Sequence, residues 1–195
     1  MKTIIATGAS MLALAFATAA LADTAAKELS FSISFPTAKS AVPLDGRVIL
    51  MLSPREGVEP RTLVEPDEPL KSPYLFSVQV DGLKPGAPAV IDAKVFGWPA
   101  ASLSAIKAGD YTVQAVLNRY LTYHRADGST VSLSPDRGEG QNWSIKPGNL
   151  YSTPIRLHVD PAHPQLIKLT LDSEIAPIKP PADSEFVRQD RKSVV

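Results

Sequence analysis

Prolines recur so often along this sequence that they leave no room for a long helix. The chain has 18 prolines and 11 glycines, and many of them lie in 54–73, 84–86 and 146–148. A proline inside a helix removes a backbone hydrogen bond and collides with the preceding turn, so nearly every candidate helical window is broken. One short helical turn is expected at 100–106. The core must therefore be built mainly from strands.

Between these breaks the side chains follow the two-residue period of β-strands. Residues 29–35 alternate apolar and mostly hydroxyl side chains, which predicts a strand with one buried and one wet face. Residues 46–52 are almost continuously apolar, which predicts a strand covered on both faces. We expect further strands at 75–80, 89–96, 111–117, 155–159 and 166–171. Many short strands separated by turns predict an all-β, antiparallel sandwich or barrel.

One tyrosine narrows this prediction to an immunoglobulin-like antiparallel β-sandwich. Leu103, Ile106 and the turn Ala108-Gly109-Asp110 lead directly into the alternating strand that begins at Tyr111. Such sandwiches often place a tyrosine at this corner, with its ring in the core and its hydroxyl bonded to backbone upstream. The alternative is an ordinary strand tyrosine that follows a glycine turn.

The first 22 residues have the order of a secretory signal peptide. Lys2 supplies the positive start, an apolar run follows from Ile4 to Leu21, and Ala20-Leu21-Ala22 ends with small residues at the cleavage positions. A membrane anchor is the alternative, but the run is rich in alanine and threonine. No second apolar run long enough to span a membrane follows. We therefore expect a periplasmic or secreted protein, with a β-sandwich domain at 23–174 and a proline-rich linker and tail at 175–195.

Charge and cysteine content exclude several classes of function. Lys+Arg and Asp+Glu number 20 each, so there is no excess of positive charge to attract nucleic acid or an anionic membrane. The chain has no cysteine, so thiol catalysis and thiolate metal sites are excluded. Disulfides likewise cannot stabilise the fold, which must depend on burial and strand pairing.

No recognisable catalytic centre appears in the chain. There is no G-x-S-x-G elbow, no H-E-x-x-H zinc pair and no glycine-rich phosphate loop with its lysine. We therefore expect no catalytic residue, no cofactor and no enzymatic activity of this chain by itself. His158, Asp160 and His163 lie close in sequence, but prolines surround them at a strand end. Exposed polar residues on a turn are the preferred interpretation over a metal site.

Residues 118–152 hold the most unusual run of polar and aromatic side chains. Asp127-Gly128 predicts a hairpin turn, and residues 138–141 predict a mobile, glycine-rich loop beside Trp143. An aromatic side chain with convergent polar groups is typical of surfaces that bind saccharides or proteins. The alternative is a long solvated hairpin whose tryptophan packs at the edge of the core. The candidate binding or interdomain surface comprises Arg119, Tyr120, His124, Arg125, Asp127, Glu139, Gln141 and Trp143.

Several phrases of this region resemble a known family. They are Asn118-Arg119-Tyr120, 124–128 (HRADG), 138–141 (GEGQ) and 147–152 (PGNLYS), together with 81–86 (DGLKPG). Taken in chain order, these motifs resemble the N-terminal region of bacterial exported esterases, over roughly residues 31–181. In that family a β-rich region precedes an α/β-hydrolase domain whose serine, acid and histidine carry the chemistry. None of those catalytic positions has a counterpart here, so the resemblance implies a non-catalytic accessory domain.

The C-terminal segment has the composition of a linker between two domains. Residues 175–181 (IAPIKPP) predict an extended, proline-stiffened linker. We expect the natural reading frame to continue past Gln189, so that the partner is a downstream α/β-hydrolase domain of the same polypeptide. The alternative is a free-standing exported module that binds a saccharide or a protein.

Overall fold

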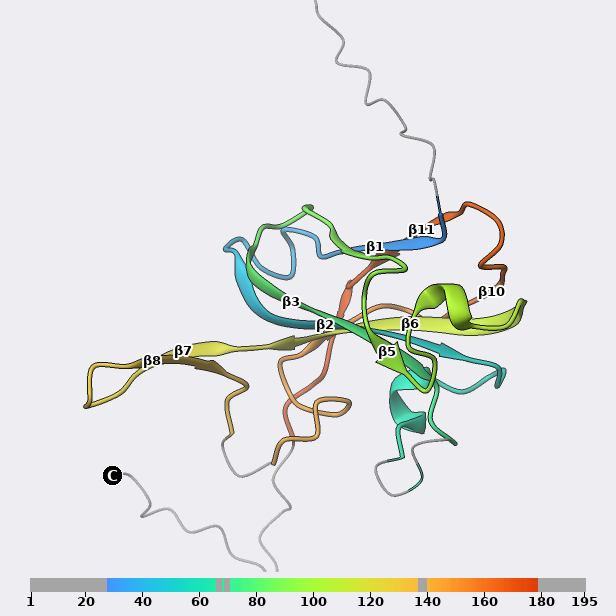
Figure 1. Cartoon of the computed structure of the whole chain (residues 1–195). Helices are drawn as coiled ribbons and strands as arrows, with labels where there is room; N and C mark the ends of the chain where they lie inside the picture. Colours follow the sequence, from blue (N-terminus) through green and yellow to red (C-terminus); the bar gives the residue numbers. More distant parts are fainter. Residues whose placement is uncertain (1–27, 66–67, 69–70, 137–139, 179–195) are drawn as a thin grey trace, which may run out of the picture.

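The computed structural model describes residues 28–65, 68, 71–136 and 140–178, and its regular structure consists mainly of strands (Figure 1). The short 3-10 helices η1 (Pro60–Leu63) and η3 (Leu103–Ala105) are single turns. The predicted all-β fold class is confirmed. The strands are β1 (Ser30–Ser34), β2 (Leu44–Ser53), β3 (Tyr74–Leu83), β4 (Ala89–Ile91), β5 (Gly97–Trp98), β6 (Gly109–Arg119), β7 (Leu121–His124), β8 (Thr130–Leu133), β9 (Leu150–Tyr151), β10 (Ile155–Val159), β11 (Leu166–Thr170) and β12 (Ser173–Glu174).

The strands form two packed sheets and one separate hairpin. The smaller sheet has the order β11-β1-β4, and the larger has the order β12-β9-β6-β2-β3-β5 with β10 also on β6. In Figure 1 the smaller sheet lies above the larger one, and the hairpin β7–β8 extends to one side of both. This two-layer arrangement agrees with the predicted sandwich.

All strand pairs of the described ranges are antiparallel except β1 with β11, which run parallel. The pairing of β2 with β3 shifts register between Leu44 and Gly46. A Cβ at Gly46 would lie 2.2 Å from the backbone oxygen of Asn118, so only glycine permits β2 to approach β6 so closely there.

Apolar side chains between the two sheets make the main core. Residues 29–35 alternate buried and half-buried positions, as their sequence pattern predicts. Phe31 and Ile33 of β1 are fully buried, as are Leu50 of β2 and Phe76 of β3. Each strand therefore contributes its inward-facing positions to one continuous core.

The outer face of the larger sheet is covered as well. Ile49, Met51 and Val116 are buried there and form a second, smaller cluster, against which Leu75, Trp143 and Tyr151 pack. This second layer explains why residues 46–52 are almost continuously apolar: alternate side chains of β2 enter different cores. The prediction of a strand covered on both faces is confirmed.

Polar contacts of Arg61, here called the clamp, connect the segments that pack on this outer face. Arg61 of η1 donates from Nη1 to the carbonyl of Ser144 at 2.8 Å, and its guanidinium lies 4.6 Å from the centre of the Tyr151 ring. Its Nε lies 2.6 Å from Oε2 of Glu59. The backbone N–H of Arg61 donates to the buried side chain of Gln114 at 3.1 Å. The clamp thus joins η1 to the segment that precedes β9.

Tyr111 occupies the predicted corner. Its side chain is buried and its hydroxyl donates to the backbone carbonyl of Lys107 at 2.8 Å. The helical turn expected at 100–106 is η3, and the hydroxyl of Ser102 caps it by accepting from the N–H of Ser104. The prediction of a strand over 89–96 is wrong beyond Ile91, because a turn begins at Asp92, which accepts from the backbone N–H of Lys94.

Candidate binding surface

The hairpin β7–β8, here called the arm, grows directly out of the larger sheet. Only Tyr120 separates β6 from β7, so the longest strand of the sheet continues into the arm. The turn is held by Asp127, whose carboxylate accepts from both the N–H and the hydroxyl of Ser129. These bonds, the hydroxyl bond foremost, hold the pKa of Asp127 below its ordinary value. The hairpin predicted around Asp127-Gly128 is confirmed.

One face of the arm is an exposed apolar stripe. Leu121 lies opposite Leu133, and Tyr123 lies opposite Val131. Directly opposed residues share a face of a two-stranded ladder, so these four side chains form one surface. Leu121 is 46% exposed, Tyr123 40% and Leu133 53%. These are large hydrophobic side chains, and leucine in particular is usually buried in a soluble domain.

The other face of the arm is polar. Thr122 pairs with Ser132, and His124 pairs with Thr130. A ring nitrogen of His124, Nδ1, lies 3.2 Å from the hydroxyl of Thr130. The two faces of the arm therefore differ in chemistry, as in a strand pair that has one side packed against another layer.

The segment after the arm is tied down around two charged side chains. Asp136 accepts from the backbone N–H of Gly140 at 3.2 Å and from the amide of Gln141 at 3.3 Å. Lys146 is buried at 2% exposure and donates from Nζ to the carbonyl of Gly140 at 2.8 Å. Part of the loop for which mobility was predicted is therefore held by side-chain bonds, namely Gly140 and Gln141.

Asn149 connects this loop to the root of the arm. Its side-chain amide donates to the carbonyl of Trp143 at 2.9 Å and to the side-chain oxygen of Asn118 at 3.1 Å. Its side-chain oxygen accepts from the backbone N–H of Arg119. Asn118 also accepts from the hydroxyl of Ser134, which follows β8. Both ends of the arm are thus anchored to one buried amide pair.

The structure does not bring the predicted surface residues together into one site. Arg119 and Tyr120 lie at the root of the arm, between β6 and β7. Trp143 packs against the outer-face cluster of Ile49, Met51 and Val116, as the second interpretation of this region predicted. Gln141 lies in the loop bonded to Asp136. Glu139 lies outside the described residues. The members at the far end of the arm are His124, Arg125 and Asp127.

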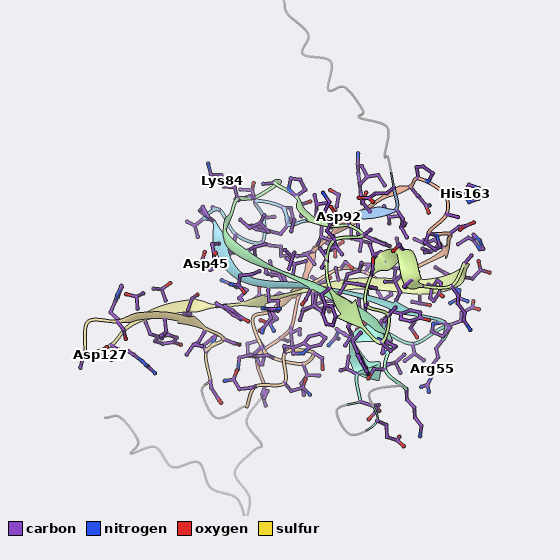
Figure 2. The ribbon with its side chains drawn as sticks, viewed as in Figure 1. Asp45, Arg55, Lys84, Asp92, Asp127 and His163 are labelled. Atoms are coloured by element: carbon purple, nitrogen blue, oxygen red, sulfur yellow. The ribbon has the colours of Figure 1, made fainter. Side chains whose placement is uncertain are left out.

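Two histidines pair with aspartates away from the arm, and Figure 2 shows His163 on the opposite side of the molecule from Asp127. His158 lies 2.8 Å from Asp110 on the neighbouring strand, and His163 lies 2.7 Å from Asp160 within a turn. The backbone N–H of Ala162 foremost, and then His163, lower the pKa of Asp160 below its ordinary value. These are two separate, exposed pairs, and within the described ranges no three metal-ligating side chains converge.

The apolar stripe was missed in the sequence, although its signal was present. Apolar residues occupy alternate positions in 121–123 and 131–133 on either side of the turn, as in a half-buried hairpin. Alternation does not reveal whether a second layer covers the apolar face. The structure describes no such layer over the stripe, since three of its side chains are at least 40% exposed.

Comparisons of the chain with protein-family models, curated proteins and solved structures gave no match. In the described part of the chain, no helix has the length and apolar character needed to span a membrane. Interpretation of the function therefore depends on the residues and their geometry.

Proposed function

We propose that this chain is a non-catalytic accessory module of an exported ester hydrolase, and that it binds the hydrolase domain with the apolar stripe of its arm. The observation that carries the proposal is the exposure of Leu121, Tyr123 and Leu133 on one face of a projecting hairpin. A two-stranded hairpin is marginally stable in water by itself, and an exposed apolar patch with polar surroundings is typical of a protein–protein contact.

The motifs that carry the family resemblance lie in the same part of the molecule as the arm. The phrases that carry it include 118–120 at the root of the arm, 124–128 at its turn and 147–152, which contains β9. A hydrolase domain that packs on the stripe would complete the missing layer. The arm would then lie between the two domains, at a place from which it can shape access to the substrate.

The test begins with the gene. Sequencing the locus downstream of the Gln189 codon should reveal a continuous frame with a serine elbow, and the downstream domain is then expressed separately. We expect it to bind this chain, and Leu121→Ser with Leu133→Ser to weaken the complex by about ten- to a hundredfold, because fully burying a leucine contributes roughly 1.5–3 kcal/mol and docking would bury the exposed half of each side chain. Calorimetric titration measures the affinity.

The matched control changes the opposite face of the same arm. Thr122→Ala with Ser132→Ala alters side chains that pair across the polar face, so the affinity should stay within about threefold of the parent chain. Equal loss in both double variants would contradict a docking role for the stripe. A genuine stop codon after Val195 in the native locus would instead favour the alternative, a free-standing exported binding module.

A further inference from the structure

An exposed tryptophan lies on the outer face of the larger sheet, beside the buried cluster of Ile49, Met51 and Val116. Trp98 belongs to β5, the last strand of this sheet, and lies directly opposite Leu75 of β3. Directly opposed residues share a face, and Leu75 packs against the outer-face cluster, so both side chains lie on the outer face. Trp98 is 47% exposed there.

Polar side chains continue this face along β3. Ser77 and Gln79 follow Leu75 at two-residue intervals, and alternate residues of a strand share a face. Arg47 of β2 lies opposite Gln79, and its Nη1 donates to the hydroxyl of Ser77 at 3.1 Å. Ser77 is half-buried, whereas Arg47 and Gln79 are exposed. The face therefore presents an aromatic ring, a hydroxyl, an amide and a guanidinium that is bonded to that hydroxyl.

The spacing and charge of these groups match a neutral, ring-shaped ligand with polar edges. Successive positions on one face of a strand are about 7 Å apart, so the polar groups lie within reach of hydroxyls on rings stacked on Trp98. Arg47 contributes a positive charge, and Asp81, which accepts from Gln79 at 3.5 Å, contributes a negative one. The two charges balance, so the face favours neither an anionic nor a cationic ligand.

We propose that this face, here called the platform (Trp98, Leu75, Ser77, Gln79 and Arg47), binds a neutral saccharide whose pyranose rings carry equatorial hydroxyls. Such a ring is flat and presents C–H groups on both faces, which pack on an aromatic ring, while its hydroxyls point outward to polar side chains. Figure 1 shows β5 and the arm on different sides of the larger sheet. The platform therefore does not depend on the proposed hydrolase partner.

The experiment titrates the full chain with cellohexaose, whose glucose rings carry only equatorial hydroxyls. Sorbitol is the control ligand, because it has an open chain of hydroxyls and offers no flat ring face. Intrinsic fluorescence reports binding through Trp98, since the chain has only two tryptophans. The response to cellohexaose should persist in Trp143→Phe and disappear in Trp98→Phe, and sorbitol should give none.

Calorimetry then compares the affinities of variants for cellohexaose. Trp98→Ala should weaken binding at least about tenfold because it removes the stacking surface, and Trp98→Phe, which keeps a smaller ring, should weaken it less. Gln79→Ala should weaken binding about two- to tenfold, as expected for the loss of one hydrogen bond. Gln165→Ala is the matched control, because it makes the same change at an exposed position beside the smaller sheet, and it should leave the affinity unaltered.

Three results would each overturn the proposal: a Kd for cellohexaose above about 1 mM, equal binding of sorbitol, or an unaltered affinity in Trp98→Ala. A loss of binding in Trp98→Ala without any change in Gln79→Ala would overturn it as well. That outcome would show a purely apolar contact surface, as for a protein partner, in place of a saccharide site.

Discussion

Tyr111 connects the core to the turn that precedes β6, and it does so with both parts of its side chain. Its ring packs near that of Tyr74, with the ring centres 6.0 Å apart and a tilt of 58°. Its hydroxyl donates to the carbonyl of Lys107. Burial foremost, and then the nearby Tyr74, raise the pKa of Tyr111 above its ordinary value. The protonated hydroxyl is therefore the form that the fold favours.

This gives a pH-dependent prediction for Tyr111→Phe. At neutral pH the variant should lose about 1 kcal/mol of unfolding free energy with the hydrogen bond. The stabilisation that comes from the raised pKa is fully present below the unfolded value near pH 10 and is lost as the pH rises through the folded value. The difference between parent and variant should thus narrow above pH 10. Urea unfolding at pH 7 and in the alkaline range measures it, and a constant difference would contradict the assignment.

At the scale of single elements, β5 can pair with β3 only because residue 97 is a glycine. Gly97 of β5 pairs with Phe76 of β3, and a Cβ at Gly97 would lie 2.3 Å from the Phe76 ring and 2.6 Å from the backbone oxygen of Leu75. Glycine therefore allows Phe76 to remain in the core while β5 hydrogen-bonds alongside it. Trp98, the other residue of β5, lies in the last strand of this sheet and is 47% exposed.

Gly97→Ala should accordingly destabilise the fold by about 1–3 kcal/mol, as other overpacked core positions do. Gly109→Ala is the matched control: neither glycine has a positive φ, and a Cβ at Gly109 would have its nearest contact at 3.8 Å, from the Tyr111 ring. That control should change stability by no more than about 0.5 kcal/mol. Thermal unfolding of both variants tests the difference, and equal midpoints would refute the steric explanation.

The arm shows how one element can satisfy its backbone while leaving its side chains exposed. The ladder of β7 and β8 pairs Leu121 through His124 with Leu133 through Thr130, and the buried amides of Asn118 and Asn149 hold its root. Nothing in this backbone pattern covers the stripe of Leu121, Tyr123 and Leu133. A strand pair with one apolar face is ordinarily half of a layered structure, which is the physical basis of the proposed docking role.

Over the whole molecule, the first and last parts of the sandwich meet in the smaller sheet. β1 lies between β11 and β4, and its parallel pairing with β11 joins distant parts of the chain. Ile33 and Leu169 lie side by side in this pairing and are both buried in the main core. Because they share one core with the larger sheet, we expect the two sheets to unfold as a single cooperative unit.

Leu169→Ala should therefore lower the free energy of unfolding by about 2–5 kcal/mol, through lost burial and the cavity left behind. Both tryptophans belong to the larger sheet or its cover, so their fluorescence reports on the layer that Leu169 does not belong to. The urea midpoint of this signal should fall with an unchanged slope. The exposed neighbour Lys168→Ala is the control, and an unshifted tryptophan signal in Leu169→Ala would show that the sheets unfold independently.

The sequence by itself determined the local features. Alternation at 29–35 and 155–159, the two-sided strand at 46–52 and the turn at Asp127-Gly128 all follow from the two-residue period of strands and from turn chemistry, which act between near neighbours. Tyr111 was found in the same way, because its partner Lys107 lies four residues upstream.

Only the tertiary structure decided which faces are covered and which side chains meet. It packed Trp143 against the cluster of Ile49, Met51 and Val116, left the stripe of the arm exposed, and brought Arg55 and Pro99 to one cavity. These contacts join residues far apart in the chain. Their geometry depends on strand order and on the closure of long loops around a shared core, and no local pattern of side chains encodes either.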